Sequence, residues 1–215
     1  MAEKKQNASL YAVIGDLVGS RRSTDRRDLH RRLSDALAGL AGNALQPLAV
    51  TAGDEFQGTF ATLGQALGAC WSVQLALLPQ AQARFGLGHG TVTVLDAERG
   101  TQDGPAWWRA RDAIEWVALA QDQAATRQLR TAYRADDTDP PGHQDAVNAA
   151  LHCRDHMVHS LDERSMRILR GMVDGLSQAE LARREGISPS AVSQRVRRDG
   201  LGVLVSVEGL LGAQP

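Results

Sequence analysis

The 215-residue chain has only two cysteines, Cys70 and Cys153, which are too far apart and too little supported by histidine spacing for a structural zinc site. We expect two reduced thiols that serve only in packing. The chain also lacks an apolar run near the roughly 20 residues that cross a bilayer. Residues 1–6 have no apolar core of a signal peptide. We therefore expect a cytoplasmic protein with no membrane partner.

The chain carries little net charge and no internal repeat. Its formal net charge of −1 gives no indication of nucleic-acid binding by itself. Basic residues nevertheless cluster between Arg183 and Arg198, which makes local charge more informative than the total. The length allows one large domain, or a medium domain with a small one. We favour two.

The first part of the chain alternates between strand and helix patterns. The apolar and turn patterns predict strands at 10–18, 48–51, 56–61, 83–95 and 126–133, and helices at 25–40, 63–78 and 105–120. Residues 96–104 are expected to form a loop. Gly53 and Asp54 suit a tight hairpin, because both residue types tolerate positive φ. This order predicts an α+β fold, an α/β sandwich with an antiparallel hairpin in its sheet.

A polar, turn-rich segment separates this part from a helical remainder. Residues 136–144 contain two prolines and a glycine, which is typical of a linker. We therefore expect an α/β ligand-binding domain at 1–135 and a small all-α domain at 145–215.

Two short acidic turns lie at the ends of predicted strands. Asp16 follows the first strand, and Asp54 lies at the tip of the hairpin with Glu55 beside it. If the hairpin lies beside the first strand, these carboxylates converge, and two are sufficient for magnesium that also binds substrate phosphates. The alternative is that Asp16 caps a turn and that Gly53 and Asp54 serve only the hairpin. The predicted metal ligands are Asp16, Asp54 and Glu55.

Four ordered motifs resemble the SatD family: residues 11–21 (YAVIGDLVGSR), 51–58 (TAGDEFQG), 85–90 (FGLGHG) and 103–111 (DGPAWWRAR). The first two are also similar to the metal-binding turns of class III nucleotidyl cyclases and GGDEF domains. The resemblance implies a ferredoxin-like, cyclase-like sandwich in which Asp16 and Asp54 bind the metal. It also implies that the backbone of residues 17–20 faces phosphates.

The sequence departs from the cyclase pattern at the catalytic helix. Trp108 stands where cyclases have an asparagine, and Arg111 is one place out of register with their arginine. Because stabilising a phosphoryl charge needs close placement of such donors, a nucleotide-sensing domain without catalysis is favoured. Arg109 and Arg111 could still attract an anion near a helix N-terminus, or could be solvated. The predicted phosphate-binding residues are Leu17, Val18, Gly19, Ser20, Arg21, Gly53, Arg109 and Arg111.

Residues 175–198 predict a helix-turn-helix. Ser177 and Glu180 form a capping box, Gly186 supplies a left-handed helix end, and Ser188 with Pro189 starts a second helix. Val192 and Val196 share its inner face. This pattern favours DNA binding in a major groove over a simple hairpin with a solvated basic face. The predicted DNA contacts are Arg183, Arg184, Ser190, Gln194, Arg195, Arg197 and Arg198, and the unit also resembles those of LuxR-type regulators and sigma factor region four.

These patterns favour a transcriptional regulator that binds DNA and a nucleotide or other phosphate ligand, with magnesium as a candidate cofactor. We expect a homodimer, since two subunits would present two DNA-reading helices to a two-fold operator. One alternative is a magnesium-dependent nucleotidyl cyclase or transferase with an appended DNA-binding domain. Another is a scaffold that binds only protein.

Overall fold

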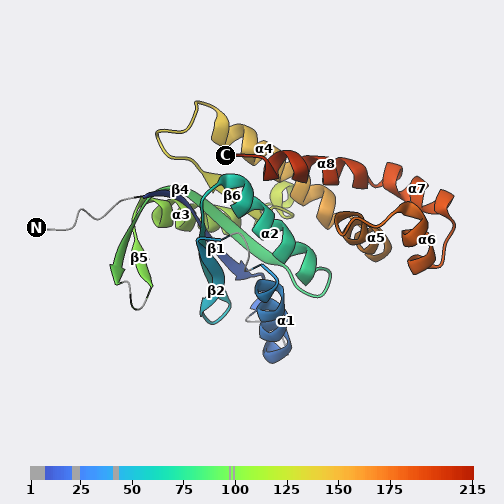
Figure 1. Cartoon of the computed structure of the whole chain (residues 1–215), viewed down its shortest axis with the longest axis horizontal. Coiled ribbons are helices and arrows are strands. Elements are labelled where there is room, and N and C mark those ends of the chain that lie inside the picture. The colour runs from blue at the N-terminus through green and yellow to red at the C-terminus, as the bar shows by residue number, and fades with distance from the viewer. Residues whose placement is uncertain (1–7, 21–24, 41–43, 97, 99) are drawn as a thin grey trace, which may run out of the picture.

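A computed structural model describes residues 8–20, 25–40, 44–96, 98 and 100–215 as a mixed α/β protein with one sheet and several helices (Figure 1). The central strand β1 pairs with β3 and β4, and the strand order is β2-β3-β1-β4-β5 with β6 also paired to β4. Among the strand pairs of the described residues, β4–β6 alone is parallel. The strands are β1 (Ala8–Leu17), β2 (Gln46–Ala52), β3 (Glu55–Phe60), β4 (Ala83–Asp96), β5 (Thr101–Asp103) and β6 (Thr131–Arg134).

Several helices begin after a residue whose side chain caps the first turn. Asp25, Thr62 and Asp162 each accept a hydrogen bond from a backbone amide in the first turn of the following helix. The helices are α1 (Arg26–Ala38), α2 (Leu63–Leu77), α3 (Pro105–Ala120), α4 (His143–His159), α5 (Glu163–Val173), α6 (Gln178–Glu185), α7 (Pro189–Arg198) and α8 (Leu201–Gly212). Within the described part of the chain, none is both long and apolar enough to cross a membrane.

Glycines in β4 bring α3 unusually close to the sheet. A Cβ at Gly86 would lie 2.2 Å from the carbonyl oxygen of Ala110, and one at Gly88 would lie 2.2 Å from that of Ala106. The two glycines, which belong to the motif at residues 85–90, therefore allow α3 to pack closely on β4. They fix where α3 crosses the strand.

The C-terminal helices pack on α2. Trp71, Leu75 and Leu78 share a buried cluster with residues of α5, α6, α7 and α8. The backbone amides of Leu63 and Gly64 donate to the carbonyls of Pro215 and Gln214 at 3.0 and 3.1 Å. Figure 1 shows α8 returning alongside α4 toward the start of α2.

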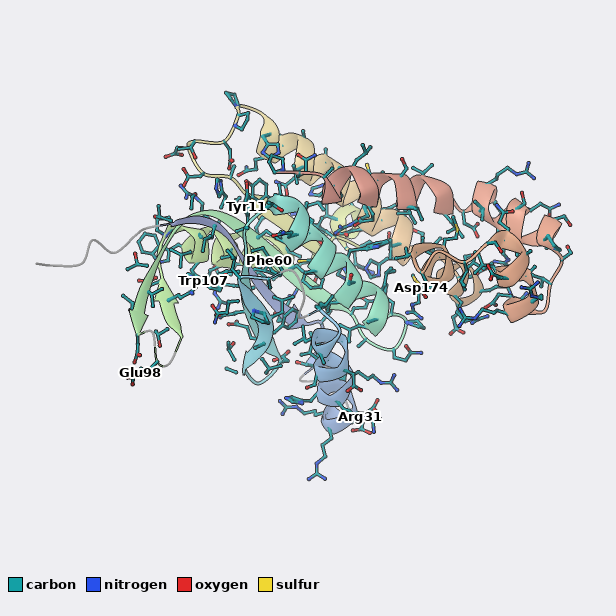
Figure 2. All side chains as sticks on the ribbon, viewed as in Figure 1. Tyr11, Arg31, Phe60, Glu98, Trp107 and Asp174 are labelled. Atoms are coloured by element: carbon teal, nitrogen blue, oxygen red, sulfur yellow. The ribbon has the colours of Figure 1, made fainter. Side chains whose placement is uncertain are left out.

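Side chains of two kinds mark the inside and the outside of this arrangement. Tyr11 and Phe60 are buried in the main core, whereas Arg31, Glu98 and Asp174 project at the periphery (Figure 2). The main core lies between one face of the sheet and α1, α2 and α4, while α3 covers the opposite face.

The predicted strands and helices are present, with two differences. Residues 101–103 form β5 inside the segment expected to be a loop, and β6 is confined to residues 131–134. Gly53 has a positive φ of 65°, but Asp54 does not. Helices α4 to α8 occupy most of residues 143–212, as expected. The domain limits at 135 and 145 stay predictions, because α2 contributes to both buried clusters.

Candidate functional site

A cavity of about 750 Å³ lies at the C-terminal end of β1 and brings the two acidic turns together. Asp16 and Leu17 line it from β1, residues 18–20 line it from the turn that follows, and Asp54 lines it from the β2–β3 turn. This follows from the register, because β3 runs antiparallel to β1 with Gly15 opposite Phe56. Gly19 and Gly53 supply the positive φ angles, 71° and 65°, that the two turns need.

Asp16 is held by an arginine that faces it on the neighbouring strand. Arg84 of β4 lies opposite Asp16 in the ladder. Its Nε and Nη2 donate to the two carboxylate oxygens at 2.8 and 2.6 Å. The hydrogen bond to Asp16 raises the pKa of Arg84, and the negative charges of Asp16 and Asp54 add to that shift. A bidentate pair of this kind is strong and fixes both side chains.

Two further arginines line the cavity from the segment between α3 and β6. Arg130 is only 7% exposed, and its guanidinium donates to neutral acceptors, the side chain of Gln82 and the carbonyls of Arg127 and Leu129. Burial lowers the pKa of Arg130, with Asp155 opposing the shift and Arg84 adding to it. Arg127 is exposed, and its guanidinium has no partner among the residues that the structure describes.

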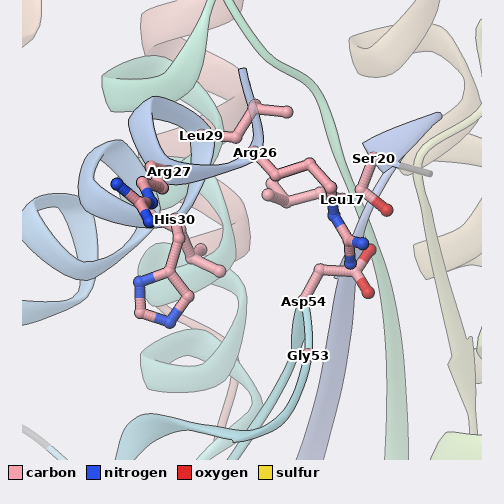
Figure 3. A pocket seen from close by; sticks show the side chains of 9 residues that line it. Leu17, Ser20, Arg26, Arg27, Leu29, His30, Gly53 and Asp54 are labelled. Atoms are coloured by element: carbon pink, nitrogen blue, oxygen red, sulfur yellow. The ribbon is translucent and has the colours of Figure 1, made fainter. Parts of the chain in front are cut away.

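A smaller cavity of about 350 Å³ adjoins the first. The two share Leu17, Ser20 and Asp54, and α1 forms the other wall with Leu29 and Leu33 among its lining residues. Figure 3 shows Leu29 and His30 on α1 across from Asp54 and Gly53 on the hairpin turn. The smaller cavity therefore offers an apolar compartment beside a polar one, although Arg26, Arg27 and His30 also line it.

Three of the predicted site residues lie elsewhere. Glu55 accepts two hydrogen bonds from Arg111, at 2.7 and 2.8 Å, which lower its pKa. Arg109 donates to the carbonyl of His89 and to Asp136. None of Glu55, Arg109 and Arg111 lines the cavity that holds Asp16 and Asp54, and Arg21 lies outside the described residues.

Two of the three predicted metal ligands, Asp16 and Glu55, are paired with arginines in this arrangement. Both carboxylate oxygens of Asp16 accept hydrogen bonds from Arg84, and Glu55 is engaged by Arg111. Among the described residues, no group of three or more His, Cys, Asp or Glu side chains is placed to hold a metal ion. Each oxygen of Asp16 keeps a second lone pair beside its bond to Arg84, so magnesium bound by Asp16 and Asp54 stays a prediction.

His89 has a structural environment. Its Nδ1 lies 2.9 Å from an oxygen of Asp139, and its ring stacks on Tyr11 at 4.4 Å. Asp139 also accepts from the hydroxyl of Tyr133 and the amide of Asp136. These contacts fasten the predicted linker to the sheet.

The helix pair α6–α7 has the local geometry that the sequence predicts. The capping box of Ser177 and Glu180 is present, Gly186 has a φ of 64°, and Ser188 caps α7. Val192 is fully buried, as expected for the inner face. The exposed side chains on the pair include Arg183, Arg184, Ser190, Gln194, Arg197 and Arg198.

Arg195 does not belong to that exposed face, which corrects the sequence prediction. Its Nη1 donates to the carboxylate of Asp162 at 2.7 and 3.0 Å and to the hydroxyl of Ser165 at 2.8 Å. These bonds tie α7 to the N-terminus of α5. Arg198 pairs with Asp199 yet stays exposed.

A buried polar group connects the cavity wall to the C-terminal helices. Asp155 accepts from the backbone amides of Arg130 and Thr131 at 2.7 and 2.8 Å. Arg154 pairs with Asp155 and with Glu208 of α8, and it lies over the ring of Trp71. Arg130 and α8 are therefore joined through two side chains of α4.

Sequence reasoning missed Arg84, Arg127 and Arg130. The one available signal was the place of Arg84 at the start of a strand beside the first acidic strand. Only the β1–β4 register shows that it faces Asp16. The other two arginines lie in a segment assigned to a strand from residue 126, which in the structure begins at Thr131.

Similarities to known proteins are unevenly informative. No curated protein matches the sequence. Among solved structures, a bacterial light-regulated adenylyl cyclase is similar at 14% identity and a TM-score of 0.47, over 61% of this chain and 44% of that one. A regulator of polyketide synthase expression from Bifidobacterium adolescentis is similar at 14% identity and a TM-score of 0.26, over 95% of this chain and 85% of that one. Both TM-scores are below 0.5, so neither similarity establishes a shared fold or function.

The family comparison covers nearly the whole chain. The sequence model of the SatD family (SatD) matches residues 10–208, which include both acidic turns and the helices α4 to α7. The chain therefore belongs to the SatD family.

Proposed function

We propose that this protein is a DNA-binding transcriptional regulator whose cyclase-like α/β part binds a nucleotide or other phosphate ligand. The observation that carries the proposal is the cavity lined jointly by Asp16, Asp54 and the turn of residues 17–20. These are the residues that the sequence indicated for phosphate chemistry. A polar cavity beside an apolar one suits a ligand with a phosphate and a ring.

The DNA-binding part of the proposal is supported by the surface of α7. Ser190, Gln194 and Arg197 are exposed on it, while Val192 is buried on its inner face. A helix held in this way can place its outer side chains in a major groove. Arg183, Arg184 and Arg198 are then placed to contact phosphates.

The buried contacts between α4, β6 and α8 support a coupling of the two activities. A ligand that prefers one arrangement of the Arg130 segment would shift α8 through Asp155, Arg154 and Glu208. We extend the proposal to a cytoplasmic homodimer, in which such a shift changes the separation of two DNA-reading helices.

The alternative function is a magnesium-dependent nucleotidyl cyclase or transferase, and the shared cavity of Asp16 and Asp54 is the observation in its favour. Its weakness is the position of Arg109 and Arg111. Both are engaged outside the cavity, where they cannot stabilise charge on a transferred phosphate. Sensing without turnover therefore accounts better for the arrangement.

The test is fluorescence anisotropy on a DNA duplex from upstream of the protein's own gene, with and without a panel of nucleotides. We expect binding that weakens with salt and that at least one nucleotide changes by about fivefold or more. In the same assay Arg197→Ala on α7 should weaken DNA binding. Arg31→Ala on α1 is its matched control and should bind DNA as the parent protein does. The proposal fails if the duplex is not bound, or if no nucleotide alters its affinity.

A further inference from the structure

Three arginines line the larger cavity together with the acidic turns and with Ala118, Gln121 and Asp122. Arg84 comes from β4, and Arg127 and Arg130 come from the segment before β6. Arg130 is buried with only neutral acceptors on its guanidinium, and Arg127 has no partner within the described part of the chain. Burying a guanidinium without a carboxylate in contact is costly unless an anion compensates it.

Arg84 already binds an oxyanion in this cavity. The two oxygens of Asp16 lie on its Nε and Nη2 at 2.8 and 2.6 Å, which is the fork geometry that guanidinium also offers to phosphate. Asp16 is therefore placed where two phosphate oxygens could replace its carboxylate.

The two adjoining cavities together carry an excess of positive charge. Their lining contains five arginines and three aspartates, namely Arg26, Arg27, Arg84, Arg127 and Arg130 with Asp16, Asp54 and Asp122. The larger cavity by itself has three arginines and three aspartates, and Arg26 and Arg27 of the smaller cavity supply the excess that attracts a phosphate group.

We infer that Arg84, Arg127 and Arg130 bind the phosphate oxygens of the ligand directly, without a bridging metal ion, while its ring occupies the apolar compartment beside α1. This inference rests on the proposed ligand-binding function and names the residues and the ligand class. Asp16 acts as a positioning residue that holds Arg84 in place while the site is empty. In a metal site, by contrast, Asp16 and Asp54 would bind the ion, and the ion would bind the phosphate.

Isothermal titration calorimetry of the full chain with inorganic pyrophosphate, in EDTA and in magnesium at one ionic strength, separates the two arrangements. We expect binding in EDTA that Arg127→Ala weakens about tenfold, since a hydrogen bond to a charged group is lost. Arg127 is exposed and unpaired, so this variant should fold. Arg31→Ala, exposed on α1 and outside the lining of both cavities, is the matched control and should bind as the parent protein does.

The Asp16→Asn variant gives opposite signs for the two arrangements. Direct binding by arginines predicts that it tightens pyrophosphate binding several-fold, because a repelling carboxylate is removed and Arg84 is released. A metal site predicts that it weakens or abolishes binding. Pyrophosphate binding that needs magnesium, is lost in Asp16→Asn and is unchanged in Arg127→Ala overturns the inference and leaves the proposed function standing.

Titration with adenosine and guanosine triphosphates against tripolyphosphate completes the test. We expect at least one nucleotide to bind more tightly than tripolyphosphate, through burial of its ring. Equal affinities overturn the part played by the apolar compartment. If no phosphate compound binds with or without magnesium, the proposed function falls together with this inference.

Discussion

Asp16 and Arg84 face each other across the β1–β4 ladder, 68 positions apart in the chain, and their side chains form a bidentate ion pair at the mouth of the candidate site. Both side chains are about three-quarters buried, at 26% and 21% exposure. Each therefore depends on the other for compensation of its charge.

A double-mutant cycle should detect this dependence. We expect Asp16→Asn and Arg84→Gln each to lower the free energy of unfolding, with a coupling of about 1 kcal/mol in the double variant. Urea unfolding followed by circular dichroism measures all four proteins. Strictly additive effects would show that the pair contributes no interaction energy.

The glycines under α3 should be intolerant of a side chain. Gly88→Ala places a Cβ against the Ala106 carbonyl, and we expect a loss of about 1–3 kcal/mol in stability. Gly68→Ala in α2 is the control, since no atom lies within 4 Å of its added Cβ. That change should stabilise the helix by about 0.5–1 kcal/mol. Similar melting temperatures for the two variants would contradict the close approach of α3 to β4.

The buried ion pairs of Arg154 should dominate the stability of the C-terminal helices. Arg154→Met leaves Asp155 and Glu208 without their shared cation, and we expect a loss of about 3–5 kcal/mol. Glu208→Gln removes only one partner and should cost less. Urea unfolding compares the two. A cost for Arg154→Met no greater than that for Glu208→Gln would be inconsistent with this arrangement.

His159 predicts a specific pH dependence. Burial, with the positive charges of Arg130 and Arg154, lowers its pKa to about 3. The unfolded chain binds a proton near pH 6.5 while the folded chain does not, so stability is full above pH 6.5 and falls as the pH drops toward 3. Comparing melting temperatures at pH 7.5 and 5.5, we expect a smaller drop in His159→Gln than in the parent protein. An equal drop would assign the effect to other groups.

Substitutions on the DNA-reading face of α7 should lower DNA affinity, whereas substitution of a residue that holds α7 in place should lower stability. Gln194→Ala and Arg197→Ala are expected to keep the melting temperature and lose DNA affinity, and Arg197→Ala should also reduce the salt dependence by about one ion. Arg195→Ala should instead lower the melting temperature, because it removes bonds to Asp162 and Ser165. Loss of DNA affinity in Arg195→Ala without loss of stability would show that Arg195 contacts DNA, as the sequence predicts.

Local chemistry was sufficient to predict most of the secondary structure. Ser177, Gly186 and Pro189 act within a few residues of their own positions, through capping and backbone sterics, so the α6–α7 pair was predictable from the sequence. The hairpin at Gly53 was predictable for the same reason. The convergence of Asp16 and Asp54 needed one further assumption, that the hairpin lies beside β1.

The tertiary structure decided which charged side chains meet. The partners Asp16 and Arg84, Glu55 and Arg111, and Asp162 and Arg195 are separated by 68, 56 and 33 positions. Strand register and helix crossing determine such pairs, and a single residue of slippage would turn each strand side chain to the other face of the sheet. The sequence alone therefore determined the two acidic turns and the capped helix pair. Packing decided that Arg84, Arg127 and Arg130 line the cavity of the two acidic turns, and that Glu55 does not.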